Sequence, residues 1–330
     1  MSVRTRRQFL TTATTGAAAF AGVMRGSASA QGTLTLRLAS GTTPGHVRSL
    51  ACDLFAKRVG ELTRDAVTVR VFHGSALGSE AQVVEALQTG TVDIGAIVLF
   101  TNAVKLGQVL DTPYIFRDTD HWARAVDGKP GALIAETAPA VGLRILSYWL
   151  GGWRDVYGSK PVNSVADLSG LKIRTLQTRV YVELFKAFGA VPTPIAWPEV
   201  YLALLQKTVD AAETALDAMH DGKHYEVSKH TALTHHGLST VALLVSEQRW
   251  KSLPESVRQA MLQAEREASE FQRAAFLKLE EETIRVLREK GMSFTSPDLA
   301  PFREIARRQV HPLVITDASQ KALAEEIAKL

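Results

Sequence analysis

Residues 34–71 read LTLRLASGTTPGHVRSLACDLFAKRVGELTRDAVTVRV, and this stretch decides the fold. Leucine alternates with other residues at positions 34, 36 and 38, and valine does the same at positions 67, 69 and 71. This period of two predicts two strands that each bury one face. Between them, residues 47–62 place apolar side chains at helical spacing, which predicts a helix. The segment is therefore a β-α-β unit.

Strand and helix patterns continue to alternate beyond this unit, so the predicted class is α/β with mixed, mostly parallel sheets. Residues 86–93 (ALQTGTVD) resemble residues 203–210 (ALLQKTVD), with five of eight aligned positions identical. Each copy predicts a helix end, a turn and the start of a strand. Gly90 suits a left-handed helix cap, whereas Lys207 in its place must accept strain or form another turn. The two copies suggest two related lobes.

The last third of the chain predicts one long helix. Pro254 suits the start of a helix, Gly291 ends the pattern, and residues 255–290 contain neither glycine nor proline. Such a helix would extend roughly 54 Å, which exceeds the diameter of one lobe. We expect residues 31–150 to form lobe 1, with later segments returning to it, and residues 151–250 to form lobe 2. Residues 251–330 are then the long helix and a C-terminal segment that packs across both lobes.

The N-terminus reads as an export signal. Residues 5–10 (TRRQFL) form a twin-arginine motif, followed by a weakly apolar stretch and the small residues Ala28, Ser29 and Ala30. We expect residues 1–30 to be a twin-arginine signal peptide that is cleaved before Gln31. An uncleaved membrane anchor is the alternative, but the apolar stretch is short for a span of about 20 residues.

Charge and cysteine content exclude several classes of protein. The four arginines of the leader account for the whole formal net charge of +4, so residues 31–330 are formally neutral. Neither the basic balance nor any Lys/Arg block therefore indicates nucleic-acid binding. The sole cysteine, Cys52, rules out an internal disulfide and lies in an apolar helix pattern, so we expect it to pack in the core.

Two arginines in apolar surroundings, Arg154 and Arg174, are the first candidates for binding an anion. Arginine can grip a carboxylate with two parallel hydrogen bonds, which lysine cannot do. The alternative is that each arginine pairs with a neighbouring Asp or Glu of the same chain.

Signatures of an enzyme are weak. The sequence has no Gly-x-Ser-x-Gly elbow, no His-Glu-x-x-His motif and no cysteine pair for a metal. Five histidines do gather between residues 220 and 236, which leaves a zinc site open as an alternative to structural or surface roles. They are His220, His224, His230, His235 and His236.

An ordered set of motifs resembles the solute-binding proteins of TRAP transporters, the DctP type. The first half contributes residues 77–80 (LGSE), 88–93 (QTGTVD) and 113–116 (PYIF). The second half contributes Arg154 and the segments 168–174 (LSGLKIR), 188–194 (FGAVPTP), 199–204 (EVYLAL) and 209–213 (VDAAE). The resemblance implies a two-lobed periplasmic binding protein fold with hinge strands, a lobe-spanning helix and one organic acid in the cleft.

The resemblance also implies site residues. Arg174 matches the principal carboxylate-binding arginine of the family, and Arg154 matches a second arginine at the same end of the ligand. Trp197 stands where an aromatic residue packs on the ligand, and Gln177 stands where a polar side chain often reaches it. Thr214 replaces a frequent asparagine, which leaves the contacts of the ligand's distal end open.

Glu213, Val98 and Glu80 complete the predicted site. Glu213 belongs to one of the shared motifs and precedes Thr214. Val98 begins an apolar run where relatives that bind large sugar acids tend to be polar, which favours a smaller or less polar acid. Glu80 and His46 stand near family ligand or water positions, and each could equally serve to cap a helix.

The resemblance implies an extracytoplasmic receptor with no catalytic residues, cofactor or metal of its own. Its expected ligand is a monocarboxylate such as a hydroxy acid, keto acid, sugar acid or aromatic acid. Its expected partners are the membrane subunits of a TRAP permease, and it is not expected to span the membrane itself. A periplasmic ligand sensor or a hydrolytic enzyme on the same scaffold is the alternative.

Overall fold

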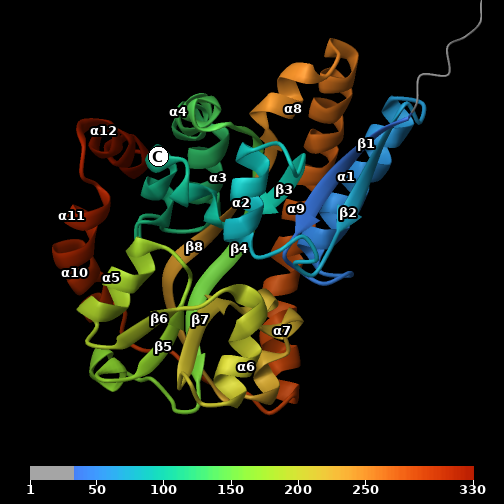
Figure 1. The fold of residues 1–330 in the computed structure, drawn as a ribbon. Helices are drawn as coiled ribbons and strands as arrows, with labels where there is room; N and C mark the ends of the chain where they lie inside the picture. Colours follow the sequence, from blue (N-terminus) through green and yellow to red (C-terminus); the bar gives the residue numbers. More distant parts are fainter. Residues whose placement is uncertain (1–32) are drawn as a thin grey trace, which may run out of the picture. The chain divides into compact units, whose positions relative to one another are not determined.

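The computed structural model describes residues 33–330 (Figure 1). The predicted leader and its cleavage site lie outside these residues. The strands are β1 Leu34–Ser40, β2 Val67–Phe72, β3 Ile94–Ile97, β4 Leu143–Gly158, β5 Lys172–Thr175, β6 Val191–Pro194, β7 Ala211–Ala215, β8 His230–Ser246 and β9 Ser293–Thr295. The predicted β-α-β opening is confirmed as β1, α1 and β2.

Helices separate most of the strands, as the alternating patterns predict. They are α1 Val47–Leu62, α2 Glu80–Gln88, α3 Thr119–Asp127, α4 Lys129–Thr137, α5 Arg179–Ala187, α6 Val200–Leu205, α7 Leu216–Asp221, α8 Glu247–Ser252, α9 Glu255–Glu289, α10 Ala300–Ile305, α11 His311–Val314 and α12 Ala318–Ala328.

The nine strands form one continuous sheet in the order β2-β1-β3-β8-β4-β7-β5-β6, with β9 beside β8. Pairs at the two ends of the sheet are parallel, whereas β3 with β8, β8 with β4 and β4 with β7 are antiparallel. The mixed, mostly parallel α/β class is thus confirmed. The sheet is continuous because the long central strands β4 and β8, with 16 and 17 residues, pair with each other and connect its two halves, β8 through β3 and β4 through β7.

These long strands join the two lobes (Figure 1). Lobe 1 contains β1 to β3 with α1 to α4 and α8, and lobe 2 contains β5 to β7 with α5 to α7. Both lobes have helices on both faces of the sheet. In β8, for example, Val241, Leu243 and Val245 belong to one buried cluster, whereas Ala242 and Leu244 belong to another. Successive strand residues point to opposite faces, so these clusters are two separate cores.

The internal repeat has the same geometry in both lobes. In residues 86–93 and 203–210, the carbonyl of the first alanine accepts two backbone hydrogen bonds from the Thr-Val pair, at 2.8 and 3.1 Å in the first copy and 2.9 and 3.4 Å in the second. Gly90 has φ +74° and Lys207 has φ +57°, so lysine adopts the left-handed conformation despite its side chain. Each copy leads into a strand that pairs parallel with its lobe's first strand.

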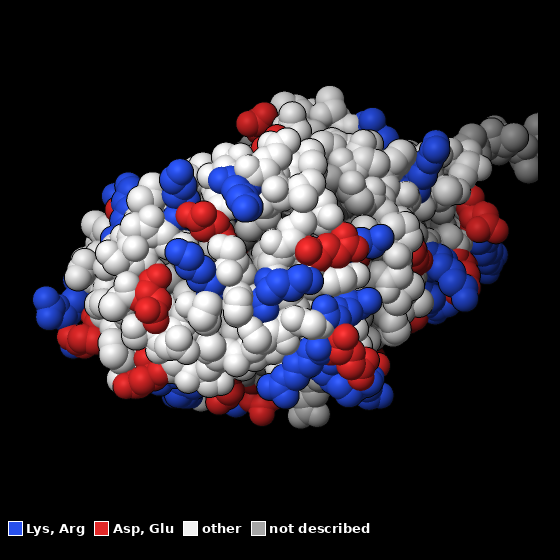
Figure 2. All heavy atoms as spheres, turned by 90° about the horizontal axis from the view of Figure 1, so that it is seen from below, with Lys and Arg blue, Asp and Glu red and all other residues white. Residues whose placement is uncertain are grey.

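The long helix is confirmed as α9, Glu255–Glu289, which has 35 residues. It contacts α1 of lobe 1, the hinge strand β4 and α7 of lobe 2, as expected for a lobe-spanning helix. Cys52 is fully buried beside Phe55 and Val59, which confirms its packing role. On the face seen in Figure 2, positive and negative side chains are interspersed.

Candidate ligand-binding site

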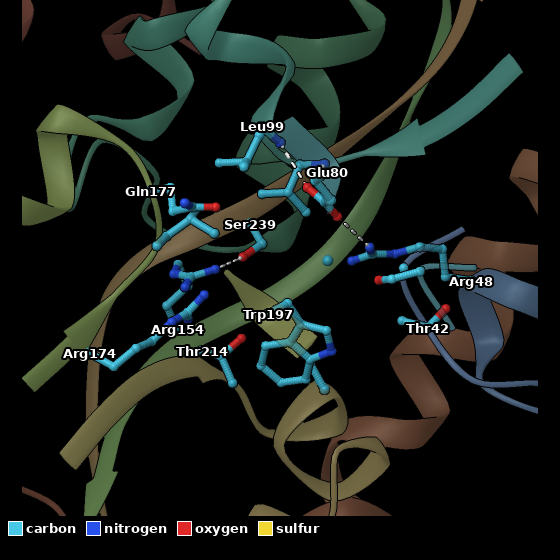
Figure 3. Close-up of a pocket in the computed structure, with 16 residues that line it drawn as sticks. Thr42, Arg48, Glu80, Leu99, Arg154, Arg174, Gln177, Trp197, Thr214 and Ser239 are labelled. Carbon is cyan, nitrogen blue, oxygen red and sulfur yellow. Dashed lines mark hydrogen bonds and ion pairs between the residues drawn. The ribbon is translucent and has the colours of Figure 1, made fainter. Parts of the chain in front are cut away.

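A cavity of about 60 Å³ lies where the two lobes meet, lined by residues of both (Figure 3). It has space for roughly four to six water molecules. The lining residues are Gly41, Thr42, Arg48, Ser75, Glu80, Val98, Leu99, Gly151, Arg154, Arg174, Leu176, Gln177, Trp197, Thr214, Ala218 and Ser239. Many of them follow the carboxyl ends of strands, where open α/β sheets bind ligands.

Arg154, on the hinge strand β4, is fully engaged by its own chain. Its Nε donates to Glu213 Oε2 at 2.6 Å, its Nη1 donates to Ser239 Oγ at 2.9 Å, and its Nη2 donates to the carbonyl of Glu213 at 3.2 Å. Burial acts to lower the pKa of Arg154, but the charge of Glu213 raises it above its ordinary value. Arg154 is therefore a charge that the protein has already paired.

Arg174, on β5 and only 1% exposed, is held differently. Its Nε donates to the carbonyl of Ile195 at 2.9 Å and its Nη1 donates to the carbonyl of Glu213 at 3.3 Å, while the nearest carboxylate oxygen of Glu213 is 3.9 Å away. Within residues 33–330, Arg174 Nη2 donates no hydrogen bond. Burial lowers the pKa of Arg174 below its ordinary value, because Glu213 only partly offsets the desolvation. This buried charge calls for a further anion.

Glu213, on β7, does not line the cavity but lies fully buried behind the two arginines. Its Oε1 accepts a hydrogen bond from Leu176 N at 2.7 Å, and its Oε2 contacts both Arg154 and His236 Nε2, the latter at 3.3 Å. Burial acts to raise the pKa of Glu213, but the charge of Arg154 and hydrogen bonds from His236 and Arg154 lower it to about 2. Glu213 therefore stays ionised and orients the arginines.

Trp197 forms an aromatic wall beside Arg174. The guanidinium carbon of Arg174 lies 5.9 Å from the centre of the Trp197 ring. The centres of the Trp197 and His224 rings are 4.8 Å apart. Tyr157 Oη and His224 Nδ1 are 2.7 Å apart, which fixes the imidazole. Burial and the charge of Arg174 lower the pKa of His224 to about 3, so this supporting ring is neutral.

The opposite wall comes from lobe 1 and centres on Glu80, the first residue of α2. Glu80 Oε2 accepts hydrogen bonds from the backbone N–H groups of Val98 and Leu99 at 2.9 and 3.0 Å, and its Oε1 accepts one from Arg48 Nη1 at 3.3 Å. Arg48, in the first turn of α1, points into the cavity (Figure 3). Of the two roles that the sequence left open for Glu80, the structure therefore places it in the cavity wall, whereas Ser79 and Gln82 cap α2.

Polar contacts between the lobes surround the cavity. His46 Nε2 lies 3.0 Å from Asp217 Oδ2, the backbone N–H of Thr43 donates to Asp221 Oδ2 at 3.1 Å, and Asn102 Nδ2 donates to the carbonyl of Gln177 at 2.9 Å. His46 Nδ1 also accepts the backbone N–H of Arg48 and caps α1. His46 therefore caps a helix and bridges the lobes, but it does not line the cavity.

The structure brings together seven of the eight residues that the sequence singled out. Arg174, Arg154, Trp197, Gln177, Thr214, Val98 and Glu80 line the cavity, and Glu213 lies behind it. Sequence reasoning missed Arg48, Thr42, Ser75 and Ser239. Arg48 sits on the polar side of the predicted helix 47–62, two residues after His46, and this placement is the one sequence signal that could have found it. The other three carry hydroxyls on common surface residue types and give no such signal.

The five histidines lie in separate surroundings. His224 and His236 are buried beside Tyr157 and Glu213, and the ring of His235 lies 3.0 Å from Asp155. His230 bonds to a serine, and His220 stacks on a tyrosine ring. Within residues 33–330 no group of three or more His, Cys, Asp or Glu side chains is arranged to hold a metal ion.

The sequence and the fold match those of known proteins. The sequence profile of the bacterial extracellular solute-binding proteins, family 7 (DctP), matches residues 38–317. The chain belongs to this family. It is 31% identical over 306 residues to the 2,3-diketo-L-gulonate-binding periplasmic protein of Escherichia coli (strain K12), covering 92% of this chain and 93% of that protein.

Solved structures of family 7 proteins agree with this assignment. A TRAP periplasmic solute-binding protein of Roseobacter denitrificans with bound β-D-glucuronate has a TM-score of 0.86 and 27% identity, covering 89% of this chain and 99% of that one. A TRAP periplasmic solute-binding protein of a Polaromonas species, bound to D-erythronate, has a TM-score of 0.85 and 28% identity, covering 90% of this chain and 99% of that one. The two-lobed TRAP solute-binding fold is thus confirmed.

The family is one of solute-binding receptors rather than enzymes. No helix in the described part of this family 7 protein combines the length and apolar character that a membrane crossing requires.

Proposed function

We propose that this protein is an extracytoplasmic receptor that binds one small organic acid by its carboxylate and delivers it to a TRAP-type permease. The single observation that carries the proposal is the state of Arg174. It is buried in the interlobe cavity, lacks a carboxylate at hydrogen-bonding distance and keeps Nη2 unused. A carboxylate entering the cavity supplies the missing anion, with Arg154 beside it.

Charge favours a monocarboxylate. Among side chains that line the cavity or form an ion pair with a lining arginine, Arg48 is balanced by Glu80 and Arg154 is balanced by Glu213. Arg174 is then the cation of this group that has no carboxylate of its own to balance it. One ligand carboxylate neutralises it, and a water-excluded site strengthens the resulting pair. Hydroxy acids, keto acids, sugar acids and aromatic acids all meet this requirement, and the relatives with bound glucuronate and erythronate support it.

Contacts from both lobes give the receptor its mechanism. A ligand shifts an equilibrium between open and closed lobes only by its differential affinity for the two states. Arg174, Trp197 and Thr214 belong to lobe 2, whereas Glu80 and Val98 belong to lobe 1, so a ligand touching both walls stabilises the closed form. We infer that the permease recognises this closed form.

The cellular setting follows from the sequence. Residues 1–30 act as a twin-arginine signal peptide and deliver the folded receptor to the periplasm, where the relative from E. coli is also placed by its name. Lobe 1 comes from residues 31–150 together with α8 and the adjoining part of β8, lobe 2 comes from the rest of residues 151–250, and residues 251–330 supply α9 and the C-terminal segment. The receptor acts without a cofactor, without binding nucleic acid and without turning over its ligand.

A ligand screen tests the proposal. Residues 31–330 are mixed with hydroxy, keto, uronic and aromatic acids while the melting temperature is recorded. A ligand that binds only the folded state raises the melting temperature. We expect at least one monocarboxylate to do so and to be recovered unchanged after incubation. Chemical conversion of the acid, or no rise with any acid, would overturn the proposal.

A further inference from the structure

The lobe 1 wall of the cavity holds a cation that the carboxylate site does not use. Arg48 lies on α1, and its guanidinium is 3.3 Å from Glu80 Oε1. Both side chains are largely buried, with 11% and 14% of their surfaces exposed. In Figure 3 the pair lies on the side of the cavity opposite Arg154 and Arg174.

Glu80 is itself fixed, and this fixes Arg48. Two backbone N–H groups, those of Val98 and Leu99, hold Glu80 Oε2, so its carboxylate cannot turn away. Arg48 Nη1 donates a hydrogen bond to this carboxylate. Within residues 33–330, Arg48 Nε and Nη2 donate no hydrogen bond. A planar guanidinium anchored at one corner presents its other donors in a defined direction. Those donors border the cavity.

We propose that Arg48 binds the end of the ligand remote from its carboxylate by donating a hydrogen bond to a hydroxyl or carbonyl oxygen there, while Glu80 keeps a second carboxylate out. This inference rests on the proposed function and names the ligand class as monocarboxylates with an uncharged oxygen at the distal end. Arg48 donates to that oxygen, and Glu80 Oε1 can accept from a hydroxyl. The hydroxyls of Thr42 and Ser75 line the same wall.

The charge of Glu80 is what separates the two ligand classes. Arg48 alone would suit a second carboxylate as well as a hydroxyl group. With Glu80 at 3.3 Å, a second ligand carboxylate would compete for a guanidinium that is already neutralised and would meet a like charge in a water-poor cavity. An uncharged oxygen meets no such repulsion. The sequence predicted a less polar ligand from Val98 alone. Val98 is one residue of this wall, which also contains Arg48 and Glu80.

Matched ligands test the inference by titration calorimetry. Each set has one chain length, four to six carbons, and contains an unsubstituted monocarboxylate, its ω-hydroxy counterpart and the corresponding dicarboxylate. We expect the hydroxyl to improve affinity by about tenfold, the worth of one hydrogen bond to a charged group. We expect the dicarboxylate to bind more weakly than the hydroxy acid. Equal affinities within every set would overturn the inference.

Two variants assign the effect to the pair. Glu80→Gln removes the opposing charge, and we expect it to raise dicarboxylate affinity relative to the hydroxy acid by about tenfold or more. The double variant Arg48→Gln with Glu80→Gln keeps the net charge of the wall, and in it we expect the hydroxy acid to lose its affinity advantage over the unsubstituted monocarboxylate. Lys57→Ala, which removes an exposed cation from the same helix, is the control and should change nothing.

The outcomes separate the two proposals. If no ligand binds wild type, the proposed function fails. If monocarboxylates bind wild type and the double variant keeps the full hydroxyl gain, or Glu80→Gln leaves the dicarboxylate disfavoured, only the role of Arg48 and Glu80 fails. Circular dichroism of each variant confirms that it is folded before its affinities are compared.

Discussion

Glu213 Oε2 lies 2.6 Å from Arg154 Nε, whereas its Oε1 lies 3.9 Å from Arg174 Nη1. One buried carboxylate therefore neutralises the first arginine and only orients the second. Because of this asymmetry the chain itself already neutralises Arg154, and we propose Arg174 as the arginine that binds the carboxylate of the ligand.

Replacing Arg174 should abolish tight binding of a carboxylate. Arg174→Ala leaves the ligand anion buried without its partner, and we expect a loss on the order of 3 to 5 kcal/mol in binding free energy by calorimetry. Arg174→Lys should recover only part of it, because an ammonium lacks the planar fork. Lys172→Ala, an exposed residue of the same strand, is the control. Unchanged affinity in Arg174→Ala would rule out this assignment.

Trp197 should matter most for ligands with a ring. Its side chain lines the cavity beside Arg174 and packs against His224. In Trp197→Ala we expect ring-bearing acids to lose about 1 kcal/mol more than short-chain acids, the usual worth of an aromatic contact. Trp197→Phe should retain most of the difference. Equal losses for both kinds of acid would show that Trp197 only packs.

Glu213→Gln should destabilise the protein in a pH-dependent way. At pH 7 the variant leaves Arg154 buried without its anion, and we expect a loss of about 3 to 5 kcal/mol in the free energy of unfolding. The folded-state pKa of Glu213 is lowered from 4.5 to about 2, so the wild-type advantage is complete above pH 4.5 and disappears as pH falls toward 2.

Urea unfolding of both proteins across this pH range measures the advantage of Glu213. Glu304→Gln, which removes an exposed ion pair with Arg307, should change stability by less than about 1 kcal/mol and serves as control. A difference between wild type and Glu213→Gln that persists undiminished at pH 2 would contradict the assigned charge state.

Asp111 should give the opposite pH dependence. It is buried and accepts a hydrogen bond from Thr101 Oγ1 at 2.5 Å, and burial raises its pKa from 3.8 to about 6. Between these values the folded protein holds a proton that the unfolded chain has released, so this group favours folding increasingly as pH falls through 6 toward 3.8.

Asp111→Asn removes this titration. Relative to the variant, wild type should gain about 2.4 kcal/mol in the free energy of unfolding as pH falls from 7.5 to 4. Subtracting the variant's curve cancels the titration of all other groups. Parallel stability curves for the two proteins would mean that Asp111 does not titrate in this range.

The class and order of the elements could be predicted from the sequence alone. The signals were the alternating patterns of residues 34–71, the repeated turn at 86–93 and 203–210, and the absence of glycine and proline from residues 255–290. Such patterns are readable because they depend on neighbours within one or two turns of the chain. The same motifs marked Arg154, Arg174 and Trp197 as site residues. Their spacing could not reveal that the strands of both lobes join in one sheet.

The roles of the site residues were decided only by tertiary structure. Arg154 meets Glu213 across 59 positions and Arg48 meets Glu80 across 32, so no local pattern could show that Glu213 lies behind the cavity or that Arg48 faces it. Charges that are far apart in sequence pair only after the strands and helices have packed. The sequence by itself determined which arginines the chain carries, and the fold decided which of them remains open to a ligand.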